Sequence, residues 1–140
     1  MTRIFVYGTL KQGFANAHIN RGVRVPGVYR TRERHTMVLL GDGHVPTLVL
    51  TPGEGHAVVG ELYDVDDETL TGMDALERIG EPGGYLRVPI ELVAHGDGVD
   101  ATDVLVADVY VRPPEHLQGV AERIGPLAEY TLAHQARFRW

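Results

Sequence analysis

One acidic residue, Glu77, lies where the sequence pattern predicts an apolar side chain. Residues 66–79 have a helical pattern, and at about 100° per residue Glu77 projects between Leu70 and Met73 on the apolar face. Burial raises the pKa of a carboxyl because the charged form loses hydration, and such a glutamic acid can move protons near neutral pH. A structural glutamate paired with an arginine, for example Arg87, fits the pattern as well. The pattern alone leaves both interpretations open.

A loop at residues 7–13, Tyr-Gly-Thr-Leu-Lys-Gln-Gly, follows the first apolar run directly. Gly8 and Gly13 permit a tight turn and a close approach of the backbone to another group. Such a loop can turn several backbone N–H groups toward one point and bind an anion, for example a substrate carboxylate. It lacks the Gly-Lys-Ser/Thr ending of a phosphate-binding loop. A plain turn between a strand and a loop is the alternative interpretation.

The remaining polar residues do not predict a metal site. The histidines, at positions 18, 35, 44, 56, 95, 116 and 134, show no ligand spacing. Asp97, Asp100 and Asp103 lack the alternating ligands and terminal glutamate of an EF-hand loop, so a polar hairpin is favoured. Tyr85 has two open interpretations, a packed strand residue or a residue that faces a substrate cavity.

The elements that position these residues are mostly strands. Strand-like runs occupy residues 3–7, 23–30, 36–40, 47–50, 57–63, 85–93 and 104–111. One helix is predicted at 66–79, where acidic residues favour its start and a glycine-rich turn at 80–84 ends it. A second helical stretch is predicted from about 116 to 135, with an interruption at Gly125-Pro126. Because strands and helices do not alternate, the pattern predicts an α+β domain with a closed or strongly curved sheet.

The composition limits the classes of function. The 140 residues fit one domain. The absence of cysteine excludes disulfides, thiolate–metal sites and cysteine nucleophiles. A net charge of −6 disfavours nucleic acid and anionic membranes as partners. No apolar run approaches the length of a membrane span and the N-terminus shows no secretion signal, so a cytoplasmic location is expected.

Several motifs occur in a characteristic order along the chain. They are Val6-Tyr7-Gly8-Thr9-Leu10-Lys11-Gln12-Gly13, then Asn16 and His18, His44-Val45-Pro46-Thr47, Gly60-Glu61-Leu62-Tyr63-Asp64-Val65-Asp66, Met73-Asp74-Ala75-Leu76-Glu77, then Pro82, Tyr85 and Arg87, and finally Val109-Tyr110-Val111. In this order they resemble the γ-glutamylcyclotransferase superfamily, and most closely its γ-glutamylamine cyclotransferase branch, which includes AIG2-like proteins. The resemblance covers roughly residues 1–112.

The resemblance implies a small mixed β-barrel with flanking helices and a cavity at one end. It also implies a reaction, in which the α-amine of a γ-glutamyl substrate attacks its own γ-carbonyl, forms 5-oxoproline and expels an amine or amino acid. The catalytic glutamate of the family corresponds to Glu77. Its substrate loop corresponds to Tyr7, Gly8, Thr9 and Leu10, and Tyr85 is a further substrate-binding candidate. The reaction needs no metal or organic cofactor, because the nucleophile belongs to the substrate.

The chain is therefore predicted to be a single domain, 1–140, with a core at 1–112 and a helical C-terminal extension at 113–140. Two departures from the family pattern concern the substrate, namely Ala75 and the glycine-rich turn at 80–84, which we expect to shape the cavity mouth. Two alternatives stay open. One is a non-catalytic small-ligand binding module, and the other is a related enzyme for a specialised acylated substrate. The leaving amine and the oligomeric state are not predicted.

Overall fold

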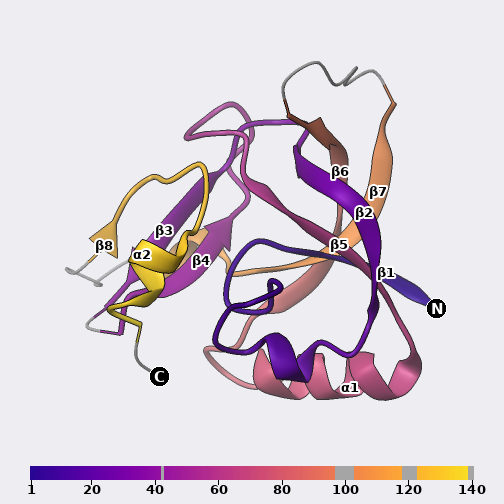
Figure 1. Cartoon of the computed structure of the whole chain (residues 1–140). Coiled ribbons are helices and arrows are strands. Elements are labelled where there is room, and N and C mark those ends of the chain that lie inside the picture. Colours follow the sequence, from indigo (N-terminus) through magenta and orange to yellow (C-terminus); the bar gives the residue numbers. More distant parts are fainter. Residues whose placement is uncertain (42, 97–102, 118–122, 139–140) are drawn as a thin grey trace.

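A closed five-stranded barrel forms the centre of the structure (Figure 1). The computed structural model describes residues 1–41, 43–96, 103–117 and 123–138. In order around the barrel, the strands are β1 (Thr2–Val6), β5 (Val59–Val65), β2 (Val23–Thr31), β6 (Leu86–His95) and β7 (Leu105–Val111). β1 and β7 run parallel, whereas the other neighbours are antiparallel. The expectation of an α+β fold with a closed mixed barrel is confirmed.

A three-stranded sheet and short helices accompany the barrel. The sheet has the order β4 (Val45–Val49), β3 (Thr36–Leu40) and β8 (Arg123–Ile124). The helices are α1 (Asp67–Leu76), α2 (Leu132–Gln135) and the 3₁₀ turns η1 (Ala17–Ile19) and η2 (Pro114–Leu117). Figure 1 shows the small sheet beside the barrel, together with the C-terminal segment, and α1 at the base of the barrel. One end of the barrel therefore lies near both α1 and the small sheet (Figure 1).

The alternation of β1 divides the core into two parts. Phe5 and Tyr7 belong to the cluster inside the barrel and toward the small sheet, whereas Ile4 and Val6 face a second cluster with Met73 of α1. This division follows from the period of two along a strand. Because both clusters enclose β1, the loop that follows β1 begins from a rigid strand end.

Helix α1 begins as predicted but ends early. The Asp66 side chain caps its start by accepting the Thr69 N–H at 2.8 Å. Met73 is fully buried, and Leu70 and Leu76 pack around it, which confirms the apolar stripe. The helix ends at Leu76, because Arg78 has a positive φ of 59°. Glu77 is therefore the C-terminal cap and not an interior helical residue.

The expectation of a mostly helical C-terminal stretch is wrong for the residues described there. Only η2 and the four-residue α2 are helical, and Arg123–Ile124 pairs with β3. Gly125 has a φ of 131°, which a helix does not allow, and the N–H of Leu127 donates to the Met37 carbonyl. Contacts with β3 therefore prevail over the local helical pattern. Residues 118–122 lie outside the described part of the chain.

Pro89 lies in the part of β6 that pairs with β7, whereas residues 92–95 of β6 pair with β2. A proline is tolerated there because its missing N–H faces no second strand. Asp97 and Asp100 of the expected hairpin lie outside the described residues. Within the described residues, no helix is long and apolar enough to cross a membrane. The cytoplasmic location stays a prediction.

Two glycines allow a matched test of the barrel packing. A Cβ at Gly60 would meet the Val6 carbonyl and lie 2.8 Å from the Phe5 ring, whereas a Cβ at Gly72 in α1 would meet nothing within 4 Å. We expect Gly60→Ala to destabilise the protein by about 1 to 3 kcal/mol through overpacking. Gly72→Ala should instead stabilise it by about 0.5 to 1 kcal/mol. Urea unfolding measures both, and equal effects of the two variants would contradict this account of the packing.

Candidate active site

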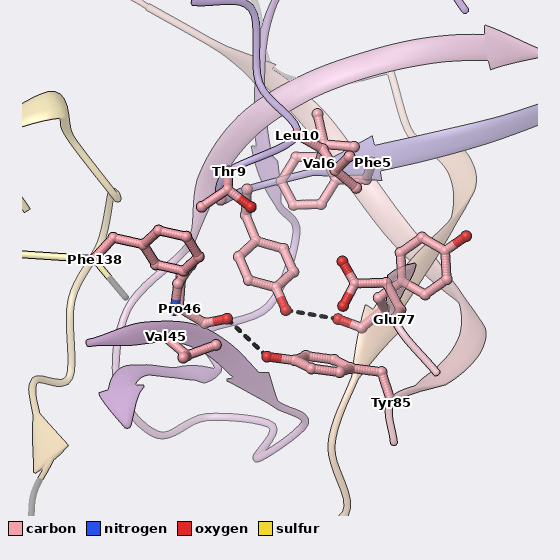
Figure 2. A pocket seen from close by; sticks show the side chains of 12 residues that line it. Phe5, Val6, Thr9, Leu10, Val45, Pro46, Glu77, Tyr85 and Phe138 are labelled. Atoms are coloured by element: carbon pink, nitrogen blue, oxygen red, sulfur yellow. Dashed lines mark hydrogen bonds between the residues drawn. The ribbon is translucent and has the colours of Figure 1, made fainter. Parts of the chain in front are cut away.

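A cavity opens at the end of β1, between β4 and the turn that follows α1. It is lined by Phe5, Val6, Tyr7, Gly8, Thr9, Leu10, Val45, Pro46, Glu77, Tyr85, Tyr110 and Phe138. Figure 2 shows the Glu77 carboxyl pointing into the space between Phe5 and Tyr85, with Phe138 on the other side. The structure therefore brings together every site residue that the sequence predicts. They come from segments up to 78 positions apart, Tyr7 to Tyr85.

The loop after β1 is buried and held by its own hydrogen bonds. Lys11 donates its N–H to the Gly8 carbonyl at 3.1 Å, and the N–H of Asn16 donates to the Thr9 carbonyl at 2.8 Å. A Cβ at Gly8 would lie 2.9 Å from the Pro46 ring, so the glycine permits the close approach of β4. The turn is thus a rigid part of the cavity wall.

Three consecutive backbone donors of this loop have no protein acceptor. Within the described chain, the N–H groups of Gly8, Thr9 and Leu10 donate to no backbone or side-chain acceptor, although all three residues are buried. Buried N–H groups are nearly always paired, because an unpaired donor costs free energy. Donors of this kind beside a cavity suit a carboxylate or an oxyanion.

The backbone at the end of α1 fixes Glu77 beside Tyr85. Glu77 donates its N–H to the Met73 carbonyl at 3.0 Å, and its own carbonyl accepts the N–H of Tyr85 at 2.9 Å. The residues between them form a turn that returns the chain to β6. A Cβ at Gly84 would collide with the Arg78 carbonyl, so this turn requires a glycine there. The Glu77 carboxyl is consequently held by backbone geometry at both ends of the turn.

The Glu77 carboxyl has an unusual electrostatic environment. Burial raises the pKa of Glu77 to about 7, and the charge of Arg112 opposes this rise. In the described part of the chain, Glu77 forms no ion pair within 4 Å. Near neutral pH, both protonation states of this carboxyl are therefore populated.

Arg87 does not pair with Glu77, so that structural alternative is wrong. Its Nε lies 3.1 Å from Asp74 Oδ1, and its Nη1 lies 2.7 Å from Asp108 Oδ2. Tyr110 Oη also donates to Asp74 Oδ1 at 2.6 Å. Because two carboxylates already surround its guanidinium, Arg87 is engaged in this network and does not reach Glu77. The network joins α1 to β6 and β7.

Both predicted tyrosines pack and line the cavity at once. Tyr7 Oη donates to the Tyr110 carbonyl at 2.8 Å and accepts the Leu48 N–H at 3.2 Å. Tyr85 Oη donates to the Pro46 carbonyl at 3.0 Å, with Thr47 Oγ1 3.1 Å away. Burial raises the pKa of both hydroxyls, so they are neutral near pH 7. Their hydroxyl groups link β4 to the barrel, and both side chains line the cavity.

Some lining residues were not assigned a role from the sequence. Tyr110 and Pro46 lie within motifs that carried the family resemblance, so a signal existed for both. Phe138, in the C-terminal tail, had none, and neither did Arg112, which follows β7 and contacts the lining residue Tyr85. The Arg112 guanidinium lies 5.3 Å from the centre of the Tyr85 ring. Sequence spacing does not indicate contacts of this kind.

A buried lysine attaches the C-terminal segment to the loop after β1. Lys11 Nζ donates to the Tyr130 carbonyl at 2.5 Å and lies 4.3 Å from the centre of the Phe14 ring. Burial lowers the pKa of Lys11. The N–H of Ala15 also donates to Gln135 Oε1 at 2.6 Å. These contacts hold the segment that brings Phe138 to the cavity.

The described residues contain no group of three or more histidine, cysteine or acidic side chains that could hold a metal ion. His35 and His56 form an isolated β-bridge through their backbones, and His134 takes part in the capping box of α2 with Thr131. None of these three histidines lines the cavity that contains Glu77.

Comparison with known proteins identifies the family. The model of the family described as "Gamma-glutamyl cyclotransferase, AIG2-like" matches residues 4–131. The chain belongs to this family. The expected family resemblance is thereby confirmed, and the match extends into the tail, beyond residue 112.

Individual family members support the same relationship. A putative gamma-glutamylcyclotransferase of Arabidopsis thaliana is 40% identical over 99 residues, which cover 66% of this chain and 52% of the relative. A gamma-glutamylaminecyclotransferase of Mus musculus is 36% identical over 118 residues, covering 79% of this chain and 77% of the relative. The chain thus spans about half the length of the plant relative. The crystal structure of an AIG2-like protein from Mus musculus superposes with a TM-score of 0.74 at 30% identity, covering 94% and 88% of the two chains.

The raised pKa of Glu77 predicts a pH-dependent stability difference. The folded state retains the proton to about pH 7, whereas the unfolded chain loses it near 4.5. The contribution of Glu77 to stability is therefore fully present below 4.5 and is lost as the pH rises toward 7. Relative to wild type, Glu77→Gln should gain on the order of 1 to 3 kcal/mol between pH 4 and pH 8.

Urea unfolding at several pH values measures this difference. Glu81→Gln is the matched control, because Glu81 is exposed and only four residues from Glu77. A Glu77→Gln profile parallel to wild type would contradict the described environment of the carboxyl.

The contact of Lys11 with Tyr130 predicts a coupling between the loop and the tail. Lys11→Met keeps an unbranched apolar stem and removes the only donor to the Tyr130 carbonyl in the described structure. We expect faster hydrogen exchange at the amides of Leu127 and Thr131, which hold the same segment. Exchange at β5 amides serves as the internal control. Unchanged exchange in the tail would show that Lys11 does not hold it.

Proposed function

We propose that this family member is a γ-glutamylcyclotransferase in which Glu77 is the general acid and base. The α-amine of the substrate attacks its own γ-carbonyl carbon, and a new C–N bond closes the 5-oxoproline ring. The bond between that carbon and the side-chain nitrogen breaks, and the amine leaves. The observation that carries the proposal is one partly buried carboxyl, without an ion-pair partner among the described residues, facing a cavity lined by unpaired N–H groups.

Glu77 suits both proton transfers of this reaction. An α-ammonium cannot attack, so the carboxylate form takes a proton from the nucleophilic nitrogen. The same carboxylic acid then protonates the departing nitrogen, which restores the carboxylate. Because burial raises the pKa of Glu77 to about 7, neither form is scarce at neutral pH. One residue therefore serves both steps without a second acid.

The loop after β1 supplies the binding and electrostatic part of the mechanism. The N–H groups of Gly8, Thr9 and Leu10 can donate hydrogen bonds to the α-carboxylate of the glutamyl group or to the oxyanion that forms at the γ-carbonyl. Tyr7 and Tyr85 form the walls that hold the flexible glutamyl chain in a folded conformation. Cyclisation depends on this conformation, because orientation of the two reacting groups lowers the entropic cost.

We infer γ-glutamyl amines as the substrate class. The mouse relative, 36% identical, carries the name gamma-glutamylaminecyclotransferase, and its match covers 77% of its length. The proposed partner is thus a small γ-glutamyl compound.

The test measures 5-oxoproline release from a panel of γ-glutamyl amines, γ-glutamyl-ε-lysine and γ-glutamyl dipeptides. Wild-type protein should release 5-oxoproline, and Glu77→Gln should reduce kcat/KM by about 10² to 10⁴ because the general base is lost. Glu81→Gln controls for the removal of a nearby negative charge. Unaltered turnover in Glu77→Gln would exclude Glu77 as the base.

The same panel also tests whether the protein is a γ-glutamylcyclotransferase at all. If neither protein releases 5-oxoproline while calorimetry detects binding of a γ-glutamyl compound, the cavity is a binding module. If neither turnover nor binding occurs across the panel, a specialised acylated substrate takes the place of the γ-glutamyl amines.

A further inference from the structure

A second cavity is also lined by Glu77. It is lined by Leu40, Gly41, Val45, Leu76, Glu77, Arg78, Gly83, Gly84, Tyr85 and Arg112. Val45, Glu77 and Tyr85 also line the first cavity, so the two cavities share this wall. A substrate whose scissile amide lies beside the Glu77 carboxyl can therefore extend into both.

The two cavities differ in their polar groups. The first offers the buried N–H groups of the loop after β1, and the second adds the guanidinium groups of Arg78 and Arg112. Among the described residues that line the second cavity, Glu77 is the only one with a carboxylate. Its remaining wall is aliphatic, from Leu40, Val45 and Leu76. An aliphatic chain that ends in an anionic group matches this lining.

Arg112 differs from the neighbouring arginines in its partners. Arg87 is enclosed by Asp74 and Asp108, and Arg78 has Glu81 at 3.9 Å on the surface. Among the described residues, Arg112 has no carboxylate within 4 Å, and its Nη2 donates to the neutral Gly83 carbonyl. Its Nε is buried without a hydrogen-bond acceptor in the described structure. A guanidinium has five donors, so Arg112 retains the capacity to bind a carboxylate.

We propose that the second cavity binds the leaving amine and that Arg112 selects leaving amines that carry a carboxylate. This inference rests on the proposed cyclotransferase function, because it assigns the glutamyl half to the first cavity and the leaving half to the second. The contact of Arg112 with the Tyr85 ring and the Gly83 carbonyl fixes the guanidinium at the shared wall. The distance between the Arg112 guanidinium and the scissile amide then determines how long a leaving amine must be for its carboxylate to reach Arg112.

The test uses leaving groups that differ only in charge. The substrates are the γ-glutamyl amides of 6-aminohexanoate, 6-aminohexanamide and 1,6-diaminohexane, which present an anion, a neutral amide and a cation at a similar reach. Wild-type kcat/KM for 5-oxoproline release should favour the anion over the neutral amide by about 10- to 100-fold, as expected for a charge-assisted hydrogen bond. The cationic substrate should be the poorest. No preference for the anion in the wild type would overturn the inference.

The ratio between substrates separates specificity from catalysis. Arg112→Gln removes a charge that opposes the rise in the pKa of Glu77, so it affects every substrate to a common degree. We expect this variant to abolish the preference for the anion, and Arg112→Lys to retain part of it. Arg32→Gln is the matched control, because Arg32 forms an exposed pair with Glu91 away from both cavities. Equal losses on all three substrates in Arg112→Gln would overturn the inference and assign Arg112 to the glutamyl half or to Glu77.

Other outcomes are equally decisive. Loss of the preference in Arg78→Gln but not in Arg112→Gln would overturn the assignment to Arg112. Release of 5-oxoproline from all three substrates at similar rates would overturn this inference and leave the cyclotransferase function intact. No release from these substrates or from the wider γ-glutamyl panel would overturn both. Circular dichroism of each variant shows whether a loss reflects unfolding.

Discussion

The arrangement of the site depends on a carboxyl that the fold partly buries without a neutralising partner within 4 Å among the described residues. Such burial is costly, and most proteins offset it with an ion pair. Here the nearest strong candidate, Arg87, is engaged by Asp74 and Asp108, and Tyr110 completes that network. The network therefore stabilises the junction of α1 with β6 and β7, and it also keeps Arg87 from lowering the pKa of Glu77. The more distant Arg112 opposes the effect of burial only in part.

Backbone hydrogen bonds, rather than an ion pair, fix the position of Glu77. Glu77 is attached to α1 through Met73 and to β6 through the N–H of Tyr85, so a seven-residue excursion between them cannot move the carboxyl away. The positive φ of Arg78 and the tight contact at Gly84 shape this excursion. Opposite Glu77, the loop after β1 ends a strand enclosed by both core clusters. Two rigid elements thus face one another across the cavity.

Local patterns predict much of this structure, and long-range contacts account for most of what they miss. The period of two identifies the strands, and the helical period places Glu77 toward the core side, since both follow from burial. The end of α1 at Leu76 depends on the turn geometry after it, which the helical pattern does not contain. The partner of Arg87 depends on the antiparallel pairing of β6 with β7, which brings Asp108 beside it. The tail follows β3 for the same reason, because its local helical pattern is weaker than pairing with an existing sheet edge.

The position of Glu77 at the end of α1 has a consequence for proton transfer. A glutamate in the middle of a helix face presents its carboxyl to one packed surface, whereas a residue at the last turn projects beyond the helix. Glu77 accordingly lines two cavities, together with Val45 and Tyr85. The proposed reaction takes a proton from a nitrogen on the glutamyl side and returns one to a nitrogen on the leaving side. A single carboxyl at a wall shared by both spaces meets this requirement with little movement, because both nitrogens are bonded to the same γ-carbon in the tetrahedral intermediate.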